Sequence, residues 1–342
     1  MRPKAALDTQ TLRANVRAWS ALAGVPVRAV VKSDGYGWGF ATLVRPLEDL
    51  VEAFIVADAE EFTQVRQLTK RPIVTLADTP ASEVARLLDG GALPNIATRP
   101  GLEAAIAWSK AAGRPALVRV GVRPAMGWAG FEAAEFPALA PLLSQPELHV
   151  ELWTHVTGAS PEQTQRARFA EIVALLSSEG VALAGNDIES SLSLRTAAQG
   201  TSVRIGVGLF GARSGAYPAD LRCALRLEAP VVLRTAASGQ AAGYGTVRAP
   251  QDGYLEVVRC GYGDGFARAT GISGILSVGM QYTVLWRGNV TTDTSVVLVN
   301  AGTDLGALAD AAAIAPHELI VRLGLAARAQ SSATQSQMHR EQ

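Results

Sequence analysis

The sequence predicts an α/β protein, a (β/α)8 barrel of the TIM type followed by a C-terminal, mostly β domain. About eight short apolar runs recur every 20 to 30 residues or so, and amphipathic stretches with helical spacing separate them. After about residue 225 this rhythm ends, and strand-like runs follow one another between turns rich in Gly, Asp and Asn. Strands that alternate with helices through eight units are typical of a closed barrel. An open doubly wound sheet is the competing architecture, but it rarely needs eight units.

The elements of the barrel follow from this alternation. Strands are predicted near residues 27–31, 53–57, 73–76, 94–97, 116–121, 149–154, 184–189 and 203–206. Helices are predicted over 9–22, 59–69, 81–89, 101–112 and 161–179. Two of these helices have recognisable starts, since Thr98 precedes Arg99-Pro100 and Ser160 precedes Pro161.

Four segments make up the predicted domain organisation. Residues 1–8 form a strand that joins the β domain, 9–226 form the barrel, 227–328 form the β domain, and 329–342 form a polar, disordered tail. One helix is expected in the β domain, at Leu305–Ala313. Its predicted strands are Val231–Ala237, Tyr254–Cys260, Tyr282–Trp286, Ser295–Val299 and Leu319–Leu323.

The composition is that of an ordinary globular protein, with 48% hydrophobic and 18% charged residues. The formal net charge is zero, so no basic surface argues for nucleic acid or a membrane. Two cysteines, Cys223 and Cys260, provide neither a disulfide framework nor the spacing of a metal site. The four histidines are scattered, which argues against a histidine-based metal site. The first residues lack the apolar core of a signal peptide, so we expect a cytoplasmic protein.

Three unusual side chains are predicted on one rim of the barrel, where such folds place their chemistry. Lys32 ends the first strand, His155 ends the sixth, and Arg204 lies on the eighth. A lysine in an apolar setting can have a pKa low enough to act as a nucleophile or base. Taken singly, each residue also has an ordinary explanation: a surface lysine, a buried core histidine and an ion-paired arginine. Their coincidence on one rim favours a functional site.

A phosphate site is predicted next to these residues. Gly206 and Gly208 would let backbone N–H groups approach an anion, and Ser190 and Ser191 could add hydroxyl groups after the seventh strand. A lysine that can form a Schiff base beside a phosphate site is the minimum that pyridoxal phosphate requires. A lysine-dependent aldolase and a barrel that binds a phosphosugar remain alternatives.

Several motifs resemble those of the alanine racemase family. Ala29-Val-Val-Lys-Ser-Asp-Gly-Tyr-Gly-Trp-Gly39 is similar to the family's lysine signature, with Trp38 where a histidine is usual. Matches to the later motifs occur in the expected order, and the likeness extends to about residue 325. They are Ala125-Met126-Gly127, Thr154-His155, Val203-Arg204-Ile-Gly206 through Gly211, Gly243-Tyr244-Gly245 and Gly261-Tyr262-Gly-Asp-Gly265.

The resemblance implies a pyridoxal 5'-phosphate enzyme that interconverts L- and D-alanine or a related small amino acid. Two bases would act on opposite faces of the substrate: Lys32, which also holds the cofactor, and Tyr244 from the other subunit of a head-to-tail homodimer. Arg204 would face the ring nitrogen and His155 would lie against the ring. The cofactor-binding residues implied are Lys32, Tyr36, His155, Ser190, Ser191, Arg204, Gly206 and Val207.

The substrate side departs from the family pattern. Trp128 replaces the arginine that binds the substrate, and Arg123 is a nearby candidate to stand in for it. Tyr262 and Thr292 match two further substrate-binding positions. Arg119 is a candidate for a fixed positive charge where the family often has a carbamylated lysine, and a phosphate-binding tyrosine is missing near Ser331.

These departures leave three hypotheses for the function. The first is an amino-acid racemase whose substrate is alanine or a relative of alanine. The second is a pyridoxal-phosphate decarboxylase on the same scaffold. Such decarboxylases bring a cysteine motif from the β domain, and Cys260 lies in a different context. The third is a catalytically weak pyridoxal-phosphate carrier or regulator.

Overall fold

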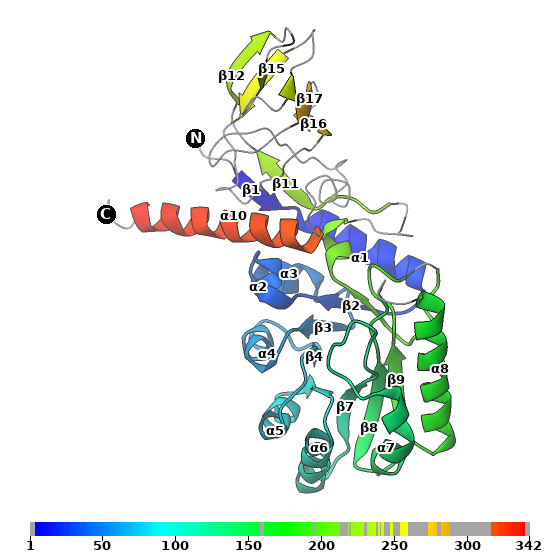
Figure 1. The fold of residues 1–342 in the computed structure, drawn as a ribbon. Helices are drawn as coiled ribbons and strands as arrows, with labels where there is room; N and C mark the ends of the chain where they lie inside the picture. Colours follow the sequence, from blue (N-terminus) through cyan, green and yellow to red (C-terminus); the bar gives the residue numbers. More distant parts are fainter. Residues whose placement is uncertain are drawn as a thin grey trace.

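The computed structural model confirms the barrel and the strand-rich C-terminal part (Figure 1). Several segments after residue 212 lie outside the described residues, and with them the predicted strand Ser295–Val299 and helix Leu305–Ala313. In the part of the chain that is described, no helix is long and apolar enough to cross a membrane. The structure describes residues 4–157, 161–194, 196–212, 218, 220–228, 231–236, 239, 241–242, 247–248, 254–258, 273–278, 282–287 and 316–338.

The barrel consists of parallel strands in two hydrogen-bonded groups. The strand order is β10-β2-β3-β4-β5 in one group and β6-β7-β8-β9 in the other. The strand predicted at 94–97 corresponds to β6, and β5 is a further short strand just before it; Pro94, which has no N–H to donate, separates the two. The bounds are β2 Val27–Val30, β3 Ala53–Val56, β4 Ile73–Thr75, β5 Ala92–Leu93, β6 Asn95–Ile96, β7 Ala116–Gly121, β8 Leu148–Trp153, β9 Leu183–Asp187 and β10 Val203–Ile205.

Hydrogen bonds beyond these ladders close the barrel. Asn95 accepts from the Thr79 N–H at 2.8 Å and donates its own N–H to Thr75 Oγ1 at 3.0 Å, which joins the end of β4 to β6. On the other side, the Arg204 N–H donates to the Glu189 carbonyl at 3.1 Å, and Ser190 forms a parallel bridge with Arg204. Because all the strands are parallel, their C-terminal ends meet at one rim.

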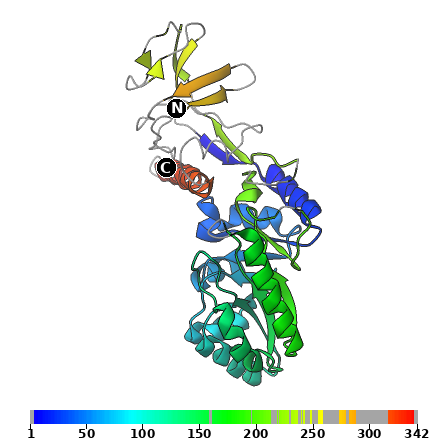
Figure 2. The same cartoon turned by 45° about the vertical axis from the view of Figure 1, so that its right-hand side comes forward.

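Helices surround the strands (Figures 1 and 2). Asp8 begins α1 by accepting from the N–H groups of Gln10 and Thr11, and Gly24 ends it at φ 68°. Thr98 caps α6, as predicted from the sequence. The helices are α1 Thr9–Ala23, α2 Lys32–Tyr36, α3 Phe40–Leu47, α4 Ala59–Arg66, α5 Ala81–Asp89, α6 Arg99–Ala112, α7 Phe136–Leu143 and α8 Glu162–Ser178, with short 3-10 helices at η1 Ala133–Glu135 and η2 Val207–Phe210.

A tier of charged side chains is buried inside the barrel, where bulky aliphatic side chains are usual. Arg28 Nη1 donates to Glu151 Oε1 at 2.5 Å, and Arg119 Nε donates to the same oxygen at 2.9 Å. Arg119 and Arg204 both donate to the Asp187 carboxylate, one to each oxygen. These five side chains come from β2, β7, β8, β9 and β10, so the ion pairs connect strands across the barrel.

The N-terminal strand pairs with a strand at the start of the C-terminal part. β1 Lys4–Leu7 pairs antiparallel with β11 Leu225–Glu228, in the register Lys4 with Glu228 and Leu7 with Leu225. The other described strands of this part form antiparallel pairs, β12 with β15, β13 with β14 and β16 with β17. They are β12 Val231–Ala236, β13 Ala241–Ala242, β14 Val247–Arg248, β15 Tyr254–Val258, β16 Ser273–Val278 and β17 Tyr282–Arg287.

Two predictions near the C-terminus need correction. The run Leu319–Leu323, predicted as a strand, belongs to the helix α10, Pro316–Met338, which also extends into the segment predicted to be disordered. Leu319, Ile320 and Leu323 are buried on one face, and Arg322 pairs with Glu318 one turn away at 2.6 Å. A short apolar run does not by itself distinguish a strand from a buried helix face. In Figure 1 α10 lies alongside β1 and α2, and it contacts both. Figure 2 shows the same helix nearly end-on.

Candidate active site

Lys32 lies two residues after the end of β2 and begins a left-handed turn. Ser33, Asp34 and Tyr36 have φ of 58°, 50° and 54°, and Gly35 has φ of 62°. Each non-glycine residue in this conformation costs about 1 to 2 kcal/mol. The backbone is therefore strained in the residues that follow Lys32, and backbone strain of this kind is concentrated at functional sites.

Glu61, on the first turn of α4, supports this turn. Its Oε1 accepts from the Ser33 N–H at 2.7 Å and its Oε2 accepts from the Ala57 N–H at 2.7 Å. Burial lowers the pKa of Lys32, while the charge of Glu61 opposes the shift. A larger share of Lys32 is consequently neutral near pH 7 than for an ordinary lysine, and the neutral amine is the form that can attack a carbonyl or accept a proton. Sequence reasoning missed Glu61 because its only signal is a carboxylate in the first turn of a helix.

Lys32 lies in a cavity of about 330 Å³ at the C-terminal rim of the barrel strands. The cavity unites the three rim residues that the sequence singled out, Lys32, His155 and Arg204, with most of the predicted phosphate-site residues. Those lining it include Tyr36, Ser190, Ser191, Gly206 and Val207, together with Trp128, Trp153 and His317.

Arg204 is held rigidly at the base of this cavity. Its Nη1 donates to the Asp187 carboxylate, and its Nη2 donates to the Thr154 carbonyl at 2.7 Å and lies 3.3 Å from His155 Nδ1. Asp187 is completely buried, and its carboxylate also forms an ion pair with Arg119. A guanidinium held on two sides can present a fixed positive charge to a ligand without reorganising.

Trp128 covers His155. The two rings stack with centroids 5.3 Å apart and planes inclined by 16°, and Lys32 Nζ lies 5.5 Å from the indole centroid. The side chain is 39% exposed. The residue at the position of the expected substrate-binding arginine therefore enters the cavity, but it offers an aromatic face and no positive charge.

His155 is predicted to make the cofactor-free protein sensitive to acid. Burial and the charge of Arg204 lower the pKa of its imidazole from 6.5 to about 3. Below pH 6.5 the unfolded chain binds a proton that the folded chain does not, so the free energy of unfolding decreases as the pH falls toward 3. The loss due to His155 is at most about 4 to 5 kcal/mol.

Urea unfolding of the wild type and of His155→Gln across pH 3 to 7 measures this contribution. The variant should show a shallower dependence on pH, because glutamine does not titrate. Parallel curves for the two proteins would contradict the prediction.

The predicted phosphate end is built around Ser191 and Gly206. Ser191 Oγ accepts from the backbone N–H groups of Gly206 at 3.0 Å and Gly208 at 3.3 Å. A Cβ on Gly206 would lie 2.3 Å from the Tyr36 hydroxyl, so glycine is required there. A Cβ on Gly208 would lie 2.6 Å from the indole nitrogen of Trp19. The structure thus places the Ser191 and Tyr36 hydroxyl groups beside Gly206, and both can donate to a phosphate. The N–H groups of Gly206 and Gly208 donate to Ser191 Oγ here and would become available to a phosphate if that side chain turned away.

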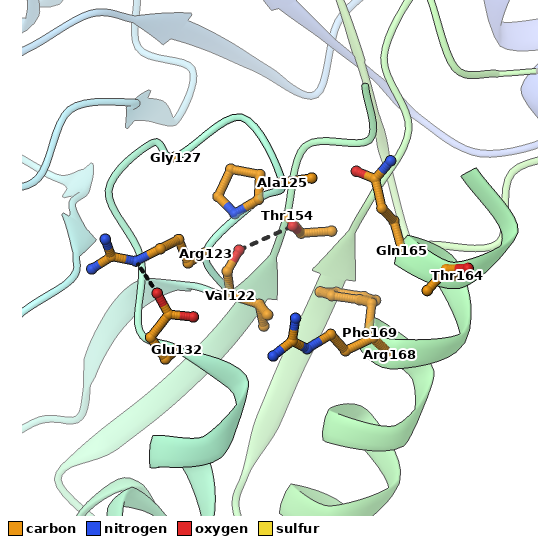
Figure 3. Close-up of a pocket in the computed structure, with 11 residues that line it drawn as sticks. Val122, Arg123, Ala125, Gly127, Glu132, Thr154, Thr164, Gln165, Arg168 and Phe169 are labelled. Atoms are coloured by element: carbon orange, nitrogen blue, oxygen red, sulfur yellow. Dashed lines mark hydrogen bonds and ion pairs between the residues drawn. The ribbon is translucent and has the colours of Figure 1, made fainter. Parts of the chain in front are cut away.

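Arg123 does not line this cavity. Its Nε lies 3.0 Å from Glu132 Oε1 and donates to the Gly130 carbonyl at 3.2 Å. Figure 3 shows Arg123 and Glu132 on one side of a neighbouring cavity of about 280 Å³, opposite Thr164, Gln165 and Arg168 of α8.

Some predicted site residues lie outside the described part of the chain, and one residue that lines the cavity was not predicted. Tyr244, Tyr262 and Thr292, predicted for proton transfer and substrate binding, lie outside the described residues. His317, at the start of α10, lines the cavity although sequence reasoning passed over it. Its sequence context contains no signal beyond a histidine, because its position depends on how α10 packs against the barrel. Among the described residues, no group of acidic, histidine and cysteine side chains could hold a metal ion.

A barrel with a lysine of lowered pKa just after a strand, a fixed arginine and hydroxyl donors suited to a phosphate defines a class of enzyme. It is the class that holds pyridoxal phosphate through a lysine. The family models for the alanine racemase N-terminal and C-terminal domains match residues 7–214 and 224–337. The chain belongs to the alanine racemase family, whose cofactor is pyridoxal 5'-phosphate.

Known alanine racemases resemble the chain over most of its length. That of Streptococcus uberis is 26% identical over 318 residues, which cover 88% of this chain and 85% of the relative. One from Streptococcus pneumoniae is 30% identical over 256 residues, 70% of this chain and 69% of the relative.

Solved structures show the same fold. The biosynthetic alanine racemase of Pseudomonas aeruginosa aligns with a TM-score of 0.77 and 26% identity, covering 94% of this chain and 97% of that one. The alanine racemase of Bartonella henselae, solved with covalently bound pyridoxal phosphate, aligns with a TM-score of 0.74 and 20% identity, covering 95% and 98%.

Proposed function

We propose that this protein racemises alanine or a related small amino acid by a two-base proton transfer with pyridoxal phosphate as cofactor. The observation that carries the proposal is the shared cavity of Lys32, His155 and Arg204 at the C-terminal rim of the barrel. Membership in the alanine racemase family supports the reaction class. A cytoplasmic location and a head-to-tail homodimer are part of the proposal.

The residues present fit the cofactor. The cavity of about 330 Å³ contains a lysine, and the hydroxyl groups of Tyr36, Ser190 and Ser191 lie with Gly206 in its lining. The N–H groups of Gly206 and Gly208, which donate to Ser191 Oγ in this structure, would turn to the phosphate when it binds. Lys32 would hold the cofactor covalently, and Tyr36, Ser190, Ser191, Gly206 and Val207 would surround the phosphate. Arg204 would lie at the ring nitrogen and His155 against the ring. Bound pyridoxal phosphate makes the Cα–H of an attached amino acid acidic.

Each side chain then has a defined task. Lys32 would be released as a free amine when the amino group of the substrate replaces it on the cofactor. The free amine would then accept or donate the Cα proton on one face, which its lowered pKa favours. Tyr244 of the partner subunit serves the opposite face, as the resemblance of the Gly243-Tyr244-Gly245 motif implies. Arg204 would present a positive charge to the ring nitrogen, which would keep that nitrogen unprotonated and limit side reactions. Tyr262, Thr292 and Trp128 contribute to the substrate side.

The choice of substrate depends on Trp128. An arginine that bound the substrate carboxylate would contribute about 1.5 to 3 kcal/mol, or roughly 10- to 100-fold in affinity. Trp128 cannot make this contact, and Arg123 is paired with Glu132 beside another cavity. Alanine and several other small amino acids therefore need to be tested side by side.

Purified cofactor-loaded protein should be mixed with L-alanine, L-serine, L-leucine and L-lysine in deuterated water. We expect deuterium at Cα, seen by proton NMR, and the D-isomer, seen by chiral chromatography, for at least one substrate. Tyr244→Phe should slow the reaction by about 10²-fold or more. Release of carbon dioxide would indicate a decarboxylase. A loaded protein that exchanges no Cα proton in any substrate would overturn the proposal in favour of a carrier.

A further inference from the structure

The helix α10 packs directly on the turn that carries Lys32. A Cβ on Gly324 would lie 2.7 Å from the backbone carbon of Gly37, and one on Gly37 would lie 2.8 Å from the Val321 carbonyl oxygen. The two glycines thus allow the backbones of the turn and the helix to approach each other closely. Without them, α10 would have to move away from the cavity.

Polar contacts hold the helix in this place. Trp38 is buried, and its Nε1 donates to the Ile320 carbonyl at 3.2 Å. Arg328 pairs with Asp34 on the same turn. Trp38 stands where the family usually has a histidine, so a departure from the lysine signature has a structural reason: the indole ties the lysine turn to α10.

This packing brings His317 into the cavity of Lys32. The His317 and Tyr36 ring centroids are 6.2 Å apart, and the Tyr36 hydroxyl lies against Gly206. Lys32 and Arg204 also line the cavity, but Lys32 would hold the cofactor covalently and Arg204 is committed to Asp187 and Thr154. His155 stacks on Trp128 and lies against Arg204 Nη2. Among the described lining residues, His317 is therefore the remaining imidazole, and its ring lies next to Tyr36 with an N–H to donate.

We propose that His317 donates a hydrogen bond to the phosphate of the bound cofactor, taking over from the tyrosine that this chain lacks near Ser331. The inference rests on the proposed position of the cofactor and not on the choice of substrate. A neutral imidazole has one N–H donor, and its protonated form has two. Trp38 and Gly324 are positioning residues, since they set where the start of α10 lies.

A comparison of two ligands tests this role. The apoprotein is titrated with pyridoxal 5'-phosphate and with pyridoxal, which has the same ring and aldehyde but no phosphate, and binding is followed by absorbance. His317→Phe should weaken the binding of pyridoxal phosphate by about 10- to 100-fold and leave that of pyridoxal within about twofold. His317→Asn, which keeps an N–H donor, should lose less.

Controls separate this inference from the proposed function. His149 is an exposed histidine on β8. The matched control, His149→Phe, should leave the affinities for both ligands unchanged. An equal loss for both ligands in His317→Phe and His317→Asn would mean that His317 supports the cavity without contacting phosphate, and unchanged affinity would also refute the contact. If His317→Phe fails to fold, wild-type-like discrimination between the ligands in His317→Leu overturns the inference. A wild type that binds neither ligand would instead refute the proposed cofactor site.

Discussion

Replacing Lys32 by alanine is expected to abolish covalent attachment of pyridoxal phosphate and to reduce racemisation by about 10³-fold or more. The variant loses both the amine that holds the cofactor and the base on one face of the substrate. The neighbouring strained turn should survive, because Glu61 contacts the Ser33 backbone and not the lysine side chain. Absorbance of the purified protein and the deuterium-exchange assay measure the two losses.

Lys70→Ala serves as the matched control, since Lys70 is an exposed lysine before the N-terminal end of β4, whereas the cavity lies at the C-terminal ends of the strands. It should retain the cofactor and the full rate. A Lys32→Ala protein that still retained the cofactor after borohydride reduction and denaturation would show that another lysine holds it. That result would remove the central residue from the proposed site.

Replacing Asp187 by asparagine is expected to lower the free energy of unfolding by about 3 to 5 kcal/mol. Asp187 receives both Arg119 and Arg204, and both arginine side chains are buried, so the variant leaves two guanidinium groups without their common carboxylate. Arg204 should also lose part of its fixed orientation, which would weaken binding of the cofactor. Urea unfolding of the apoprotein measures the first effect.

A surface ion pair provides the comparison. Asp49 accepts from two nitrogens of Arg13 at 2.5 and 2.7 Å, but its side chain is 62% exposed. Water screens such pairs, so Asp49→Asn should cost far less than Asp187→Asn. Equal losses for Asp187→Asn and Asp49→Asn would mean that the buried tier contributes little to stability.

The fold was readable from the sequence because its signals are local. Apolar runs such as Ala53–Val56 and helices such as Ala81–Asp89 are recorded in the periodicity of neighbouring residues, and Thr98 marks a helix start. Errors occurred where local signals are ambiguous. Leu319–Leu323 is apolar along a short run, and its helical state depends on burial against the barrel.

The meeting of Lys32, His155 and Arg204 in one cavity was also predictable. Lys32 and His155 lie just after the ends of β2 and β8, Arg204 lies on β10, and the topology alone brings the ends of parallel strands to one rim. The prediction that Arg123 could replace the missing arginine had no such support. Its direction depends on the path of one loop, and the structure pairs it with Glu132 beside the neighbouring cavity.

The sequence by itself therefore determined the barrel, the place of Lys32 on its rim and the family, because short-range patterns and motifs carry each of them. Only the tertiary structure decided that Asp187 joins two arginines, that Trp128 stacks on His155, and that α10 carries His317 to the cavity. These contacts join residues far apart in the chain. They form only when one backbone packs closely against another, as at Gly37 and Gly324. No pattern of neighbouring residues predicts how closely two distant segments approach.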